Sequence, residues 1–363
     1  MAEPPQALFV SYTAVLGGAE RILLDQATAL GGRVALACPE GALADAARAS
    51  GLPVVSLTEQ RAELRGSARD RLAAPLRLAA QRKEVRRAVV DLRPRCVLGW
   101  SMRGLLVAAG ALAAMRDAPP LVFCHNDLLP SRGVGLAVRA AASRAQRVVA
   151  LSHAIAEDLD PAGRLAVEVI HPGVDLERFT PAPLPEGPPQ ALLLGAIVGW
   201  KRPGLALEMA ELAARELPGL TLRLAGAPLG EAGRDLGRAL ERCSAATGLA
   251  RLDGGVADVP GLLARSTCLL HCADREPFGV ALTEALACGR PVVAPRAAGP
   301  LEIVDESCGA LYEPGDAAAG AGALVHVVRH AHEMAGPARE RAERLFDRRT
   351  SRRRFRALVE ELA

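Results

Sequence analysis

Two glutamates and a glycine occupy one short segment in a pattern that suits the binding of a phosphorylated ligand. Glu276 precedes a predicted helix, Gly279 lies at its start and Glu284 falls in its second turn. Gly289 and then Pro291 end the helix. A helix N-terminus offers free N–H groups to a phosphate, and glycine lets an anion approach the backbone closely. The pattern indicates one extended anionic ligand, contacted at two places.

Other interpretations of these residues are weaker or remain open. Both carboxylates lie on one wall, whereas a glycosidase pair flanks the scissile bond and ligands of one metal lie close together. A purely structural role, with Glu276 capping the helix and Glu284 in solvent, is the alternative for this segment alone. Cys268, His271 and Cys272 have no second ligand pair at zinc spacing, so we expect no metal site.

The elements that must position this segment form two alternating series. Short β-prone apolar runs alternate with helical patterns, which is typical of parallel sheets wrapped by helices. The first series has runs at 7–11, 34–38, 54–57, 96–98, 121–124, 148–151 and 167–170, and the second at 191–194, 221–225, 267–271 and 291–294. Segment 180–190 contains five prolines and predicts a linker. Ligands of such folds bind at the carboxyl ends of the strands.

The length of 363 residues also favours two domains over one. We expect α/β domains over 1–179 and 191–336, joined by the linker at 180–190. The Arg-rich segment 337–363 is predicted to be helical and to pack back on the first domain. Its apolar anchors are Phe346, Phe355, Leu358 and Leu362.

Composition excludes several classes of protein. Aromatic residues are 3% of the chain and the net charge is +3. The composition therefore shows neither aromatic side chains for stacking nucleic-acid bases nor a charge that strongly attracts nucleic acid. The longest apolar stretch, 104–115, has 12 residues, and a membrane span needs about 20. The first residues lack the pattern of an export signal, so a cytoplasmic protein is expected. Residues 61–95 carry +7, which fits either a solvated basic face or peripheral contact with an anionic membrane or acceptor.

Segment 274–294, DREPFGVALTEALACGRPVVA, resembles the Glu-x7-Glu signature of glycosyltransferase family 4, whose members are retaining enzymes of the two-lobed GT-B fold. Other landmarks of that family follow in order along the chain. They are GGAER at 17–21, SHAIAEDL at 152–159, IHPGVDLERF at 170–179, Gly195 to Lys201, Gly255-Val256 and GPLEIV at 299–304. The resemblance implies an acceptor-side Rossmann-like domain, then a nucleotide-sugar-binding one, and a last helix that crosses back.

The resemblance also implies roles for individual residues. Glu276 contacts hydroxyls of the donor sugar, Glu284 binds the ribose, and backbone around Phe278, Gly279 and Val280 contacts the sugar. Lys201 pairs with the diphosphate, and His125 at the end of the fifth predicted strand faces the donor sugar. The catalytic residues implied are thus His125, Lys201 and Glu276. The further donor-binding residues implied are Gly17, Gly18, Arg202, Gly255 and Val256. The donor is a nucleotide-diphosphate sugar, the acceptor a small molecule, glycan or lipid-linked glycan, and no cofactor or metal is needed.

One departure from the family pattern keeps rival functions open. Family members commonly have Gly-Arg where this chain has Gly195-Ala196, so one of two expected phosphate-binding cations is absent unless the neighbouring Arg202 replaces it. A binding or scaffold subunit without turnover is the first rival, and a sugar phosphorylase or epimerase of the same fold is the second. A dehydrogenase is disfavoured because no Gly-x-Gly-x-x-Gly follows the first strand.

Overall fold

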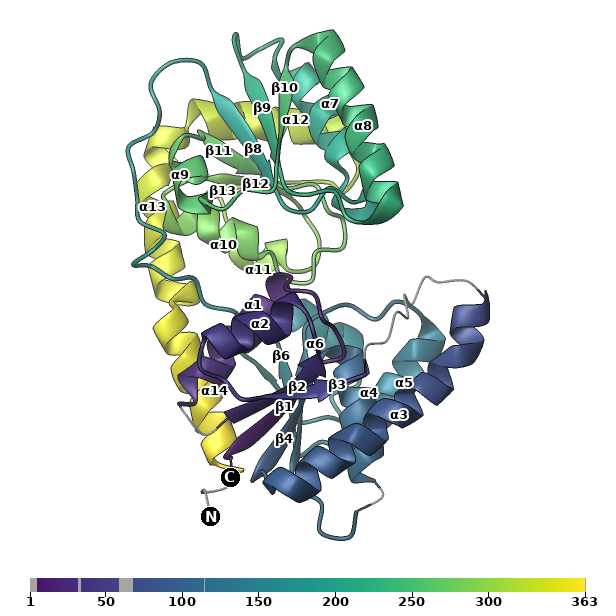
Figure 1. Ribbon diagram of the computed structural model, residues 1–363. Helices are drawn as coiled ribbons and strands as arrows, with labels where there is room; N and C mark the ends of the chain where they lie inside the picture. Colours follow the sequence, from purple (N-terminus) through teal and green to yellow (C-terminus); the bar gives the residue numbers. More distant parts are fainter. Residues whose placement is uncertain (1–4, 32–33, 59–67, 114, 363) are drawn as a thin grey trace. The chain divides into compact units, whose positions relative to one another are not determined.

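The computed structural model describes residues 5–31, 34–58, 68–113 and 115–362 and divides the chain into two compact units (Figure 1). The first unit comprises Met1–Pro172 together with Arg349–Ala363, and the second is Gly173–Arg348. Each unit has its own parallel sheet. The predicted α/β class is confirmed.

The sheet of the first unit has strand order β3-β2-β1-β4-β5-β6-β7, and every pairing in it is parallel. All seven runs predicted in this half form strands. These are β1 (Ala7–Val10), β2 (Val34–Pro39), β3 (Val54–Leu57), β4 (Cys96–Trp100), β5 (Leu121–His125), β6 (Arg147–Ala150) and β7 (Val167–Val169). Four of the inner strands, β1, β2, β4 and β5, are buried along their length because helices cover both faces.

Helices cover the two faces of this sheet in separate groups (Figure 1). One face packs against α3 (Ala68–Leu92), α4 (Ser101–Leu112) and α5 (Arg132–Ala142). The other packs against α1 (Gly18–Ala29), α2 (Ala42–Ala49) and α14 (Arg348–Glu360). α6 (His153–Leu159) lies between β6 and β7 in sequence.

The final helix belongs to the core of the first unit. Phe355 of α14 stacks on Phe9 of β1 with ring centroids 6.2 Å apart, and Leu358 and Val359 are buried in the same cluster. Ser351 Oγ donates a hydrogen bond to the carbonyl oxygen of His171 and accepts one from the Gln26 amide. The predicted return of the last helix to the first domain is therefore confirmed.

The sheet of the second unit has order β10-β9-β8-β11-β12-β13 and is also parallel throughout. Its strands are β8 (Gln190–Leu194), β9 (Thr221–Ala225), β10 (Ala250–Gly254), β11 (Cys268–Leu270), β12 (Val292–Pro295) and β13 (Gly309–Tyr312). Its helices are η1 (Gly199–Lys201), α7 (Pro203–Ala213), α8 (Gly230–Thr247), α9 (Val259–Ala264), α10 (Val280–Ala287), α11 (Pro300–Ile303), α12 (Ala317–Arg329) and α13 (Ala331–Phe346).

The unit boundaries differ from those expected, because the proline-rich segment belongs to the second unit. Buried Arg290 donates hydrogen bonds from Nη2 to the carbonyl oxygens of Ala182 and Pro183, at 2.9 and 2.8 Å. Its Nε donates to the carbonyl oxygen of Leu263. One guanidinium thus attaches the segment to the last turn of α9, and the chain passes between units near 172 and 348 instead.

Replacing Arg290 by methionine should detach the proline-rich segment, since the charged donors of these hydrogen bonds are lost. We expect the second unit to be destabilised by about 3 kcal/mol and cleavage at Glu186 by a glutamate-specific protease to accelerate. Limited proteolysis and thermal unfolding measure the two effects. Arg234→Met, an exposed position on α8, is the control. Unchanged cleavage in Arg290→Met would show that the guanidinium does not hold the segment.

The long predicted helix 337–363 is in fact two helices that belong to different units. Asp347 between α13 and α14 has extended backbone, and Phe346 before it packs edge-on against Phe278 of the second unit.

No helix among the described residues is long and apolar enough to span a bilayer. Of the basic region 61–95, for which membrane contact is one interpretation, residues 61–67 lie outside the described part of the chain.

Candidate active site

The strand order of the second sheet changes direction between the neighbouring strands β8 and β11. The first residues of the signature segment lie in the loop after β11. The chain continues from β8 toward β9 and β10 on one side and from β11 toward β12 and β13 on the other. Ligands of open parallel sheets bind outside the carboxyl ends of the strands at such a switch point. The loop after β8 carries Lys201, and the loop after β11 carries Glu276.

Lys201 and Glu276 form an ion pair across this switch point. The Lys201 ammonium donates to Glu276 Oε2, and both side chains are more than four-fifths buried. The ammonium also lies 4.3 Å from the ring centroid of Trp200. His271 Nε2 lies 3.2 Å from the same carboxylate oxygen. The pair predicted to act on one donor is thus brought together.

The surroundings of Glu276 keep it ionised. Burial alone would raise the pKa of its carboxyl, but His271 and the Lys201 ammonium outweigh burial and lower the pKa to about 2. A carboxylate in this state accepts hydrogen bonds and cannot serve as a general acid near neutral pH.

The loop after β8 places a second cation beside a second carboxylate. Arg202 Nη1 donates to Asp274 Oδ2 at 2.6 Å, from a residue in the left-handed backbone region that precedes α7. Its charge is therefore already balanced within the unit. Ala196, where the family commonly has arginine, supplies no charge.

Two glycines allow the loops after β8 and β9 to touch. A Cβ on Gly226 would lie 1.8 Å from the carbonyl oxygen of Gly195, so any larger residue there would push the loops apart.

Gly279 has a φ of 114° as the residue before α10, and a Cβ there would lie 2.8 Å from Leu282 Cδ1. Glycine is needed at this helix start, and the prediction of a helix from about Phe278 and Gly279 is confirmed.

The other donor-binding positions expected in this unit lie along the same carboxyl edge. Phe278 is buried with its ring against Phe346, so only its backbone is available to a ligand. Val280 begins α10 and Glu284 lies in that helix, both partly buried. Exposed Gly255 and half-buried Val256 follow β10.

Sequence reasoning missed two members of this cluster. His271 was considered only as a metal ligand and Asp274 was given no role, yet they contact Glu276 and Arg202. The signal available was position, because both residues follow the strand that leads into the signature segment. Cys268 and Cys272 lie instead in the apolar core, where the Cys272 thiol is 3.8 Å from Met209 Sδ.

The expected residues of the first unit lie at the carboxyl edge of its own sheet. Gly17 is the residue before α1, and its N–H donates to Glu20 Oε2 at 3.1 Å. A Cβ on Gly18, the first residue of α1, would meet nothing within 4 Å. Packing within the chain therefore does not require glycine at position 18, and space is left beside the helix start.

His125 ends β5 as a fully buried residue whose ring stacks on Phe123. Neither ring nitrogen has a hydrogen-bond partner among the described residues. Burial lowers its pKa to about 3. The imidazole is therefore neutral at physiological pH, with one donor and one acceptor open to a polar ligand.

This neutral histidine predicts a pH-dependent stability. The unfolded chain binds a proton at His125 below about pH 6.5, whereas the folded protein does not until about pH 3. The free energy of unfolding should therefore fall with falling pH in this window, by about 1.4 kcal/mol per pH unit from this residue. His125→Gln should remove that contribution, as urea unfolding of both proteins between pH 4 and 7 would measure. A constant difference between them would contradict the prediction.

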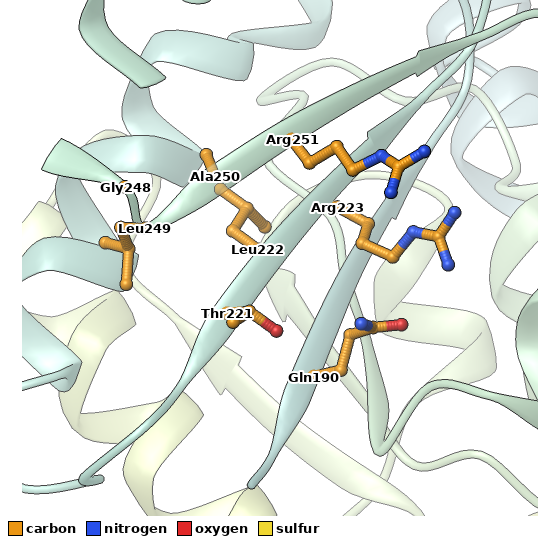
Figure 2. Close-up of a pocket in the computed structure, with 8 residues that line it drawn as sticks. All are labelled: Gln190, Thr221, Leu222, Arg223, Gly248, Leu249, Ala250 and Arg251. Atoms are coloured by element: carbon orange, nitrogen blue, oxygen red, sulfur yellow. The ribbon is translucent and has the colours of Figure 1, made fainter. Parts of the chain in front are cut away.

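Figure 2 shows a pocket of the second unit whose lining includes neither Lys201 nor Glu276. Gln190, Thr221, Arg223 and Arg251 line it at the amino ends of β8, β9 and β10, and both arginines contact Asp253. The edge at which parallel sheets bind their ligands is the opposite one, so this pocket is not assigned to the candidate site.

Comparison with known proteins identifies both units. Residues 16–178 match the model for "Glycosyltransferase Family 4", and residues 176–343 match that for "Glycosyl transferases group 1". The D-inositol 3-phosphate glycosyltransferase of Mycolicibacterium smegmatis is 31% identical over 253 residues, and the match covers 60% of this chain and 54% of that protein. The aligned region thus spans about half the length of this relative.

Solved structures match over nearly the whole chain. The Anabaena protein HepE, crystallised in complex with UDP and glucose, has a TM-score of 0.80 at 24% identity, covering 98% of this chain and 99% of that one. A glycosyltransferase of Rickettsia africae has a TM-score of 0.83 at 16% identity, covering 99% and 98%. These matches confirm the predicted GT-B fold. The two family models together cover residues 16–343, and the matches support a glycosyltransferase of the family 4 type.

Proposed function

We propose that this protein is a retaining glycosyltransferase that moves a sugar from a nucleotide-diphosphate sugar to an acceptor hydroxyl. The observation that carries the proposal is the Lys201–Glu276 pair at the β8/β11 switch point, in which Glu276 lies four residues before the first residue of α10. An ammonium and a helix N-terminus at one place suit a diphosphate, and a buried carboxylate beside them suits sugar hydroxyls. The complex of HepE with UDP and glucose supports a uridine donor.

The chemistry follows from the charge that develops on the leaving group. When the sugar–phosphate bond breaks, negative charge accumulates on the diphosphate, and the Lys201 ammonium stabilises this state more than the ground state. The acceptor hydroxyl attacks from the face that the diphosphate leaves, and a diphosphate oxygen takes its proton. Glu276 binds sugar hydroxyls and is not a nucleophile in this scheme. No metal takes part.

Donor binding requires the Lys201–Glu276 pair to rearrange. The diphosphate competes with Glu276 Oε2 for the ammonium, while the sugar hydroxyls offer the carboxylate new donors. Each partner in the ion pair thus exchanges the other for a group of the donor. After this exchange the ammonium is paired with the diphosphate and the carboxylate accepts hydrogen bonds from hydroxyls, which matters because a buried charge without partners is costly.

A panel of nucleotides and nucleotide-sugars in differential scanning fluorimetry tests the proposal. We expect UDP and UDP-sugars to raise the melting temperature and the other bases to raise it less. A transfer assay with the stabilising donor and a set of hydroxyl acceptors then tests turnover. If none of the nucleotides raises the melting temperature, the proposal is wrong.

Ala196 favours one second candidate, a subunit that binds the donor without turnover. The expected second phosphate-binding cation is absent, and Arg202 is occupied by Asp274. Losing one charge-assisted contact costs about 1.5–3 kcal/mol. Donor binding without transfer or hydrolysis, across neutral and anionic acceptors, would favour this candidate over the enzyme.

A further inference from the structure

Arg103 brings a cation to the carboxyl edge of the first sheet, at its own switch point. The chain continues from β1 toward β2 on one side and from β4 toward β5 on the other. Arg103 lies in the first turn of α4, which follows β4, and Tyr12 lies in the loop after β1. The guanidinium carbon is 4.7 Å from the centroid of the Tyr12 ring. This contact joins the two loops that diverge at the switch point.

The start of α4 is packed tightly against the ends of β1 and β4. A Cβ on Gly104 would lie 2.5 Å from the carbonyl oxygen of Val10, and one on Gly99 would lie 2.7 Å from the Cα of Leu105. These two glycines place the positive end of a 12-residue helix directly at the strand ends. Arg103 and the helix N-terminus therefore act on the same region.

Several buried polar atoms at the same edge have no hydrogen-bond partner among the described residues. Buried polar groups are nearly always hydrogen-bonded, so unpartnered atoms at the ends of neighbouring strands suit a polar ligand. The atoms follow or end the neighbouring strands β1, β4 and β5. They are Ser11 Oγ, Trp100 Nε1, Ser101 Oγ, both ring nitrogens of His125 and Asn126 Nδ2. Ser11, Trp100 and His125 are each at most 1% exposed.

Arg103 differs from its counterpart Lys201 in having no carboxylate partner in the described part of the chain. Lys201 is paired with Glu276, whereas among the described residues Arg103 contacts only the aromatic ring of Tyr12. Burial lowers the pKa of Arg103, which reflects the cost of keeping this charge without a partner. The carboxylates of Glu20 and Asp127 place negative charge near Tyr12. They would repel a bound anion, so its attraction to this region would depend on the Arg103 guanidinium.

We propose that the first unit binds its acceptor at the β1/β4 switch point, that this acceptor is a sugar or polyol carrying a phosphate group, and that Arg103 selects it. The inference rests on the proposed transfer reaction and names its acceptor class. The guanidinium fork matches a phosphate with two hydrogen bonds, the amides of α4 add further donors, and the unpartnered side chains suit hydroxyls. Arg103 thereby determines specificity and takes no part in bond breaking.

Calorimetric titration with inorganic phosphate tests the site, with chloride replaced at constant ionic strength. The titration uses the Lys201→Met variant, so that phosphate binding in the second unit is suppressed. We expect phosphate to bind this protein, added Arg103→Met to weaken binding at least tenfold, and Arg103→Lys to retain part of it. Arg87→Met is the charge-matched control, since Arg87 is exposed near the end of α3, where the chain leads to the amino end of β4. It should bind as its parent does.

Two results would overturn the inference. One is absence of phosphate binding to Lys201→Met, and the other is equal binding with and without Arg103. If Arg103→Met fails to fold, Arg103→Lys decides, because losing the planar fork alone should weaken phosphate binding. UDP binding to the Arg103 variants in the Lys201 wild-type background is measured separately. UDP binding without phosphate binding would contradict only the proposed acceptor site. Phosphate binding without UDP binding would contradict the proposed donor site.

Discussion

Replacing Lys201 by methionine is expected to lower kcat for sugar transfer about 10²–10³-fold, the usual effect of removing one group aimed at charge that develops in the transition state. Methionine keeps much of the length of the side chain and removes only the ammonium. The loss should appear mainly in kcat, because the charge on the leaving diphosphate grows as the bond breaks. Steady-state kinetics over a range of donor concentrations would measure it.

The chain offers a matched control for this variant. Lys83 on α3 is the only other lysine in the sequence and is exposed. Lys83→Met should transfer sugar at the wild-type rate. Wild-type kcat in the Lys201→Met protein would remove the central assumption of the proposed mechanism.

Replacing Glu276 by glutamine should separate turnover from nucleotide binding. The amide is a poorer acceptor for sugar hydroxyls, and loss of one hydrogen bond to a charged group is worth about 1.5–3 kcal/mol, or about 10–10²-fold in kcat. UDP should bind at least as tightly as to wild type, since the Lys201 ammonium no longer has to break an ion pair with a carboxylate before it binds the diphosphate. Isothermal titration with UDP and transfer kinetics give the two numbers.

Glu241→Gln, an exposed position on α8, controls for the loss of a negative charge in the same unit. It should change neither quantity. If UDP affinity of Glu276→Gln falls in step with kcat, Glu276 supports the architecture of the site and does not compete with the diphosphate. Circular dichroism of the variant distinguishes that outcome from unfolding.

The strands that sequence reasoning found and missed differ in burial. Every inner strand of both sheets was predicted, since apolar runs mark strands covered on two faces. The two missed strands, β10 and β13, are the two edges of the second sheet. β10 reads ARLDG and no residue in it is fully buried. An edge strand needs less apolar surface, so its sequence carries a weaker signal.

The candidate site was predictable where backbone geometry decides and less so where side chains meet. Gly279 and the helix start follow from the segment itself. The ion pair of Lys201 with Glu276 joins residues 75 positions apart, and the contact of His271 with that carboxylate depends on where β11 ends. The resemblance supplied Lys201 and Glu276 as one site. It did not supply His271, Asp274 or the engagement of Arg202.

The predicted linker shows how composition misleads about boundaries. Five prolines in 180–190 indicate a segment without regular structure, and apart from its last residue, which begins β8, the segment has no strand or helix. Irregular backbone need not separate two units, however. Arg290 lies about a hundred residues away in sequence and holds the carbonyl groups of this segment.

The placement of α14 sets the order in which the two units become complete during synthesis. Gly173–Arg348 is continuous, so the ribosome synthesises every residue of that unit before residues 349–362 are made. The N-terminal sheet meanwhile lacks Phe355, Leu358 and Val359, which fill its core. The part of the polypeptide that is translated first is therefore the last to acquire its full interior, and a nascent chain arrested near residue 348 would expose an unfilled apolar face on that sheet.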